Sequence, residues 1–75
     1  MIDKSILDKM DYSEVSYMLH HNQEALDKLQ ENPNFATVAG ISFKEASADI
    51  FSEQAQLFRR MADIYDMWVS GMREN

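Results

Sequence analysis

The chain has 75 residues, of which 45% are hydrophobic, with no cysteine and a formal net charge of −6. This length predicts one domain spanning residues 1–75, and the lack of cysteine excludes disulfides and thiolate zinc sites. Basic residues cluster nowhere beyond Arg59-Arg60, so we expect no direct binding to nucleic acid, which requires a basic face. No apolar run approaches the roughly 20 residues that span a bilayer, and the N-terminus lacks the apolar segment of a signal peptide. We therefore expect a cytoplasmic protein with no membrane partner.

The first predicted helix covers residues 3–10. Ile2, Ile6 and Met10 are four residues apart, with Leu7 beside them, which predicts one apolar helical face. Asp3 and Ser5 are both candidate N-caps, because each side chain can accept a hydrogen bond from a free backbone N–H.

The second predicted helix covers residues 13–31. Asp11 and Glu14 have the spacing of a capping box, and the residue before Pro33 is pushed out of the helical region, so the connecting loop spans residues 32–42. One face of this helix carries residues at the i, i+3, i+4, i+7 spacing of an amphipathic helix, namely Val15, Met18, Leu19, Asn22, Ala25, Leu26 and Leu29.

The third predicted helix covers residues 43–73, with Ser42 and Glu45 as its capping box. At a rise of 1.5 Å per residue it would be about 46 Å long, more than most small domains need. Its polar residues recur every three or four positions and form a polar stripe of Lys44, Glu45, Asp49, Ser52, Glu53, Gln56, Arg59, Arg60, Asp63, Asp66, Ser70 and Arg73.

The apolar residues of the long helix form two adjacent stripes. The first stripe consists of Phe43, Ile50, Leu57, Met61, Ile64 and Trp68, and is interrupted by Ser47 and Gln54. The second stripe consists of Phe51, Ala55, Phe58, Ala62, Tyr65, Val69 and Met72. Two stripes are typical of a helix with two neighbours.

These patterns predict an all-α fold, a helical hairpin with a short N-terminal helix, a middle helix and a long C-terminal helix. The middle helix can cover the first stripe, but nothing remains to cover the second, and each large side chain left exposed forgoes roughly 1.5–3 kcal/mol of burial. We therefore expect two copies to assemble as a dimeric four-helix bundle. The alternative is a monomeric three-helix bundle that buries all of these residues.

The candidate interface residues are the large side chains of the long helix. They are Phe51, Phe58, Met61, Tyr65, Trp68, Val69 and Met72. The partner is either a second copy or a different protein. Asn22 lies on the apolar face of its helix, where a buried polar residue can fix helix register, with Gln54 as its candidate partner; the alternative is a boundary position that reaches water.

Residues that could carry chemistry are few. His20, His21 and Glu24 are the one metal-like group, but a site normally needs ligands from a second element; a pH-sensitive interface is the alternative reading. No serine sits in a glycine-rich elbow, and the paired carboxylates Asp63 and Asp66 lie on a solvated stripe where burial cannot tune their acidity. We expect no enzyme activity, no cofactor and no metal.

The segment "EALDKLQENPN", residues 24–34, resembles the helix end and proline turn of type III secretion needle subunits, which are small helical hairpins of similar length. The resemblance covers eleven residues. The long helix lacks that family's C-terminal pattern and is more aromatic, so the resemblance assigns no family.

The pattern as a whole favours a small non-enzymatic interaction module. We expect a dimer that docks on one larger protein as an inhibitor, adaptor or chaperone, in the manner of bacterial or phage accessory proteins. The alternatives are a self-assembling structural or secretion-apparatus subunit, and an amphipathic protein of membrane surfaces, which the mixed charge of the polar face disfavours.

Overall fold

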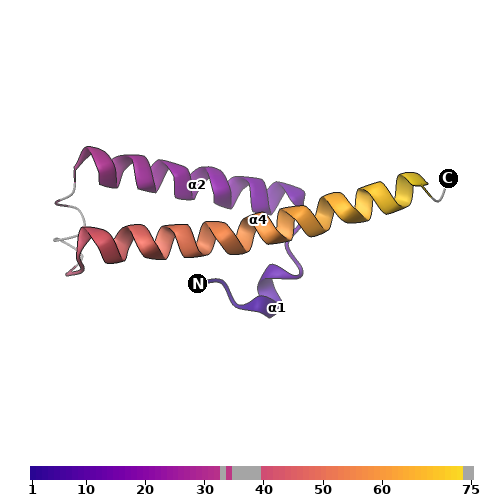
Figure 1. The fold of residues 1–75 in the computed structure, drawn as a ribbon, viewed down its shortest axis with the longest axis horizontal. Coiled ribbons are helices and arrows are strands. Elements are labelled where there is room, and N and C mark those ends of the chain that lie inside the picture. The colour runs from indigo at the N-terminus through magenta and orange to yellow at the C-terminus, as the bar shows by residue number, and fades with distance from the viewer. Residues whose placement is uncertain (33, 35–39, 74–75) are drawn as a thin grey trace.

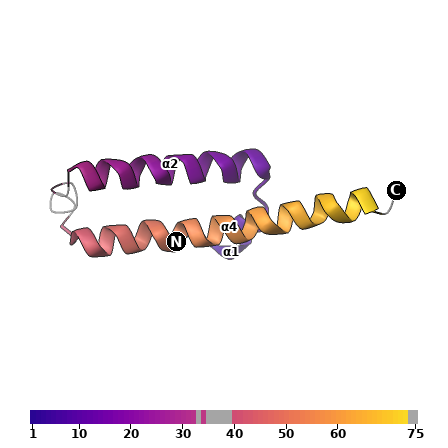
Figure 2. The ribbon, with the colours of Figure 1, turned by 45° about the horizontal axis from the view of Figure 1, so that its top comes forward.

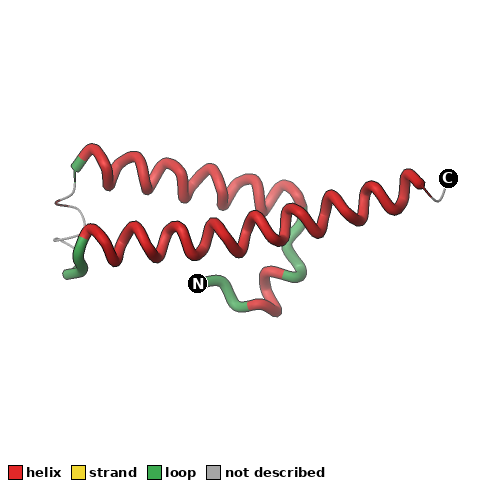
Figure 3. Tube along the Cα trace, viewed as in Figure 1, coloured by secondary structure: helices red, strands yellow, loops and turns green. Residues whose placement is uncertain are grey.

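The computed structural model describes residues 1–32, 34 and 40–73. Three helices make up this part of the chain, α1 (Lys4–Leu7), α2 (Tyr12–Glu31) and α4 (Phe43–Arg73), and it contains no strand (Figure 3). The predicted all-α hairpin is therefore confirmed.

Helices α2 and α4 lie side by side as an antiparallel pair, and α1 packs against α4 (Figure 1). The second view shows the same pairing of α2 with α4 (Figure 2). Tyr12, the first residue of α2, contacts the rings of Tyr65 and Trp68. The residues of α4 that follow Trp68 therefore extend beyond the start of α2, as Figure 1 shows.

Both long helices begin at capping side chains that the sequence predicts. The N–H of Glu14 donates to Asp11 Oδ1 at 2.8 Å and the N–H of Asp11 donates to Glu14 Oε1 at 3.3 Å, which confirms the predicted capping box. The N–H of Glu45 donates to Ser42 Oγ at 3.1 Å, and α4 begins at residue 43 as predicted. Helix α2 begins one residue earlier than predicted and ends at Glu31. Of the predicted loop 32–42, residues 33 and 35–39 lie outside the described residues.

Gly40 stands shortly before α4 with a φ of 79°. This is the left-handed region, which glycine adopts without the steric cost that a Cβ atom adds.

The first helix is shorter than predicted. It spans only Lys4–Leu7, with Asp3 as the N-cap accepting from the N–H of Ser5. The N–H of Lys9 donates to Ile6 O and that of Met10 to Leu7 O, both at 3.1 Å. These tighter i to i−3 bonds end the α-helix and turn the chain toward α2. Leu7 and Met10 are buried as expected, but Ile6 is 59% exposed.

The core lies where α1, α2 and α4 meet. Val15 and Leu57 are completely buried at its centre. The full cluster of buried residues is Leu7, Met10, Val15, Leu57, Met61 and Ile64. Leu26 and Leu29 are also buried, on the part of α2 closer to the connecting loop, so α2 uses the apolar face that its spacing predicts.

The hairpin is only about one helix thick. Its principal extents are 53 × 23 × 15 Å, and a helix with its side chains is about 10–12 Å across. The Cα radius of gyration is 15.3 Å, whereas a compact domain of this length has a radius of about 11 Å. None of the described helices combines the length and apolarity that crossing a membrane would demand.

Candidate protein-interaction surface

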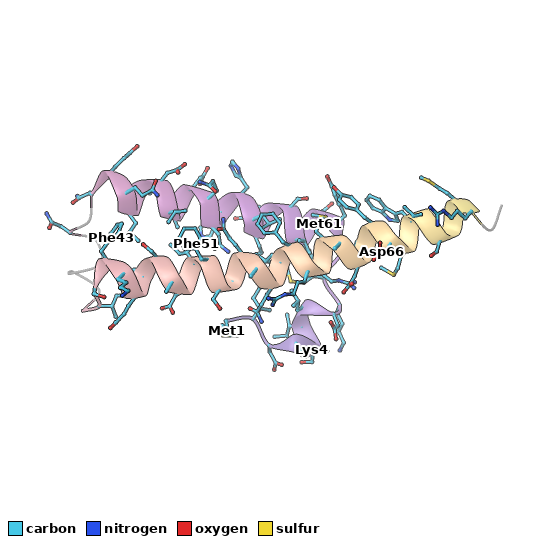
Figure 4. All side chains as sticks on the ribbon, in the orientation of Figure 1. Met1, Lys4, Phe43, Phe51, Met61 and Asp66 are labelled. Carbon is cyan, nitrogen blue, oxygen red and sulfur yellow. The ribbon has the colours of Figure 1, made fainter. Side chains whose placement is uncertain are left out.

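The second stripe lies on the surface of the hairpin. Its large side chains are exposed by 53% at Phe51, 59% at Phe58, 47% at Tyr65, 42% at Val69 and 76% at Met72. In the first stripe, by contrast, the central residues Leu57, Met61 and Ile64 are buried. Figure 4 shows the labelled Phe51 between α2 and α4 in that view. A contiguous exposed apolar surface of this kind is typical of an interaction site.

Two of the predicted interface residues have other surroundings. Met61 is 9% exposed and belongs to the core of its own chain, so it is not part of the exposed surface. Trp68 is half exposed and lies beside the second stripe, with its ring centroid 5.3 Å from Tyr12 and 5.4 Å from Tyr65.

Tyr12 was missed by the sequence analysis. Its ring lies 6.4 Å from that of Tyr65 and completes an aromatic cluster with Trp68. Its position next to the Asp11 cap, at the start of the helix facing the aromatic end of α4, was the signal that could have identified it. Such tilted ring pairs stabilise a contact by about 0.5–1.5 kcal/mol beyond the area they bury.

The N-terminal segment covers the part of the polar stripe of α4 that contains Gln56 and Arg60, called the polar flank below. It does not cover the second stripe. The N–H of Ile2 donates to Gln56 Oε1 and Gln56 Nε2 donates to Ile2 O, both at 3.0 Å. Arg60 Nε donates to Met10 O, also at 3.0 Å. Gln56 and Arg60 belong to the predicted polar stripe, but both are half-buried. The N-terminal segment is therefore held to the polar flank by hydrogen bonds, and the second stripe remains open.

The candidate polar contacts Asn22 and Gln54 are both buried. Asn22 Nδ2 has no hydrogen-bond partner in the described part of the chain, and neither has Ser47 Oγ, so Asn22 does not donate to Gln54. A buried donor without a partner costs about 1–3 kcal/mol.

The two histidines of α2 have separate partners. Glu24 Oε1 lies 3.0 Å from His20 Nε2, and His21 stacks on Tyr17 with 6.3 Å between ring centroids. No three of the described His, Asp and Glu side chains are grouped to hold a metal ion. A pocket of about 300 Å³ between α1 and α4 is lined by side chains of both charges, Lys4, Leu7, Asp8, Gln56, Arg59, Arg60 and Asp63.

Comparison with known proteins does not place the chain in a family. No family model matches it, and neither a curated protein nor a solved structure is significantly similar. The exposed second stripe is therefore the feature from which its function has to be argued.

Proposed function

We propose that this protein is a small non-enzymatic interaction module that acts as a homodimer. Two hairpins pair through the second stripe into a four-helix bundle, and the dimer docks on a larger protein as an inhibitor, adaptor or chaperone. The observation that carries the proposal is the exposure of Phe51, Phe58, Tyr65, Val69 and Met72 along one side of α4.

The thin shape of the hairpin supports the proposal that a second copy supplies another layer of helices. Stable domains usually pack two layers of secondary structure around one core, whereas this hairpin is only 15 Å thick. Its accessible surface is 5622 Å², while a compact monomer of its mass, 8.7 kDa, would expose about 4,700 Å². The excess of about 900 Å² is close to the area of about 800 Å² that each partner buries in a standard protein interface.

The free energy of burying the second stripe also favours a dimer. Fully burying a large apolar side chain contributes roughly 1.5–3 kcal/mol. Phe51, Phe58 and Tyr65 are each about half exposed, so an interface over them recovers several kcal/mol. The net stability of a small domain is only about 5–15 kcal/mol, so a gain of this size favours pairing.

The dimer is tested by measuring mass in solution. Sedimentation equilibrium or light scattering at micromolar concentration is expected to give twice the chain mass of 8.7 kDa. Phe58→Glu is expected to give a helical monomer, because the charge would be buried in the interface. Ile6→Glu is the matched control, since Ile6 and Phe58 are both 59% exposed but Ile6 lies on α1, away from the second stripe. A wild-type monomer at these concentrations would refute the homodimer.

Docking on a larger protein is supported by the end of α4 that extends beyond α2 (Figure 1). Met67, which lies outside the second stripe near this end, is 55% exposed, and methionine adapts to varied apolar surfaces. With a partner isolated from the native host and purified, a stoichiometric complex is expected, without turnover of that partner. Met67→Glu is expected to weaken the complex more than it weakens the dimer. A partner that is converted chemically, or that binds the variant equally well, would contradict this part of the proposal.

The alternative is a self-assembling structural subunit, which the extension of α4 also favours. A head-to-tail contact through that end would not close and would generate open-ended assemblies. The two functions differ in how mass depends on concentration. A closed dimer reaches a plateau, whereas an open assembly continues to grow in light scattering.

The cytoplasm is the compartment that this proposal assigns. A chain with no cysteine needs no oxidising environment for its fold.

A further inference from the structure

The second stripe alternates large and small side chains with a strict seven-residue period. The large residues are Phe51, Phe58, Tyr65 and Met72, each seven positions after the one before. The small residues are Ala55 and Ala62 of the stripe and Ala48, which extends the stripe by one position toward the start of α4; Val69 takes the next position of that series. Ala48 and Ala62 are exposed and Ala55 is half-buried. Together these residues form the two core positions of a coiled-coil heptad repeat, one position large and the other small.

This alternation discriminates between the two ways in which identical helices can pair. In a parallel pair each position faces itself, so phenylalanine would meet phenylalanine and alanine would meet alanine. In an antiparallel pair the two core positions face one another, so a large side chain meets an alanine or, at one position, Val69. Facing positions of unequal size fill space evenly, whereas layers of two large or two small residues produce strain or cavities.

We propose that α4 pairs with α4 of a second copy in antiparallel orientation, with large side chains of the second stripe packed on small ones across a two-fold axis near residue 60. This inference rests on the proposed homodimer and specifies its geometry. In this register all members of the stripe are used, and the facing pairs are Ala48 with Met72, Phe51 with Val69, Ala55 with Tyr65 and Phe58 with Ala62.

The charged residues beside the stripe give this register one favourable contact and one contact between like charges. On the flank away from α2, Glu45 of one copy would lie beside Arg73 of the other, and Arg59 would lie near its own counterpart at the axis. A shift by one heptad would instead place Arg59 beside Asp66 but would leave Phe51 without a facing residue. Exposed charge pairs contribute little because water and salt screen them, whereas burial of a phenylalanine contributes more. Packing therefore decides the register.

The position of α2 agrees with the antiparallel orientation. Gln54, Met61 and Trp68 form the other flank of the stripe, and this flank faces α2, because Gln54 and Met61 are buried and Trp68 contacts Tyr12. A two-fold axis perpendicular to the paired α4 helices places both α2 helices on the same side. The result is a four-helix bundle. In a parallel pair the two α2 helices would lie on opposite sides and could not meet.

Distances between spin labels test orientation and register together. The chain has no cysteine, so Asp49→Cys, Asp63→Cys and Ser70→Cys each give one labelling site, and all three residues are exposed and outside the second stripe. At a rise of 1.5 Å per residue, pairing about residue 60 separates the labels along the helix axis by about 30 Å at both residue 49 and residue 70, and by about 10 Å at residue 63. Circular dichroism and mass of each labelled variant establish that it is folded and dimeric.

Each outcome has a distinct meaning. Nearly equal long distances at residues 49 and 70 with a short one at residue 63 support the proposal. Similar distances at all three sites would indicate a parallel dimer and would overturn it, while leaving the homodimer intact. Unequal distances at residues 49 and 70, such as about 45 and 20 Å for a shift of one heptad, would overturn the register. A monomeric mass with no dipolar coupling would overturn both this inference and the homodimer.

Discussion

The side-chain amide of Gln56 exchanges two hydrogen bonds with the backbone of Ile2. The N–H of Ile2 donates to Oε1 and Nε2 donates to the carbonyl of Ile2, each at 3.0 Å. These bonds join residues 54 positions apart in the chain. They hold the N-terminal segment on the polar flank of α4, so that Leu7 and Met10 reach the core.

Gln56→Ala is expected to lower the free energy of unfolding by about 1–2 kcal/mol, because both partly buried groups of Ile2 lose their partner. Urea unfolding at one fixed protein concentration measures this change, and hydrogen exchange of the α1 amides should accelerate. Gln30→Ala, which changes an exposed glutamine of α2, is the control. Equal unfolding curves for Gln56→Ala and this control would show that the two hydrogen bonds contribute nothing.

Asn22→Leu is expected to raise the free energy of unfolding by about 1–2 kcal/mol. The substitution replaces a buried amide whose Nδ2 has no partner among the described residues with an apolar side chain of similar size. Asn22→Ala is the comparison, because it removes the same amide but leaves a space behind. In thermal unfolding at matched concentration, the melting temperature of Asn22→Leu should be higher than that of the wild type, and the melting temperature of Asn22→Ala should be lower than that of Asn22→Leu. A lower melting temperature for Asn22→Leu than for wild type would contradict the assignment of Asn22 as a destabilising residue.

Asp11→Ala is expected to lower the free energy of unfolding by about 1 kcal/mol, the usual cost of losing an N-cap. The carboxylate of Asp11 accepts from the N–H of Glu14 at 2.8 Å, and alanine has no acceptor to replace it. Asp11→Asn keeps a side-chain oxygen and is expected to stay close to wild type. Chemical unfolding measures the free energy of unfolding of both variants. An equal decrease for Asp11→Ala and Asp11→Asn would indicate that the hydrogen bond to Glu14 does not account for the contribution of Asp11 to stability.

The fluorescence of Trp68 is expected to depend on protein concentration. It is the single tryptophan of the chain, is half exposed and lies beside the second stripe. Dissociation on dilution should transfer its ring further into water and move its emission to longer wavelength. Phe58→Glu should show the long-wavelength emission at every concentration, while Ile6→Glu should follow wild type. Emission that stays constant while the measured mass halves would show that Trp68 lies outside the interface.

The two long helices of this protein, α2 and α4, are readable from local patterns. The pairs Asp11 with Glu14 and Ser42 with Glu45 mark helix starts because capping is a contact within four residues. The buried face of α2 follows from its 3.6-residue periodicity, since residues on one face share one environment. The same periodicity divides α4 into stripes, and the burial of Leu57 and Ile64 agrees with the first stripe. The function proposed for the second stripe remains a prediction.

The course of the N-terminal segment was not readable in this way. Ile2, Ile6 and Met10 have helical spacing, yet the chain turns after Leu7, and four residues make too short a helix for periodicity to govern. Arg60 and Gln56 looked like solvated members of a polar stripe. Their role as anchors depends on backbone groups some 50 positions away, and no local pattern records such partners.

By itself, the sequence determined the all-α class, the starts of the long helices and the division of α4 into apolar and polar stripes. These properties depend on hydrogen bonds and periodicities within a few residues of each position. The tertiary structure alone decided that α1 is confined to Lys4–Leu7 and that Tyr12 joins the rings of Tyr65 and Trp68. It also decided that the N-terminal segment covers the polar flank of α4 and leaves the second stripe open. Those outcomes depend on contacts between segments that are far apart in the chain. Such contacts are determined by chain topology and side-chain packing, which exist only in the folded hairpin.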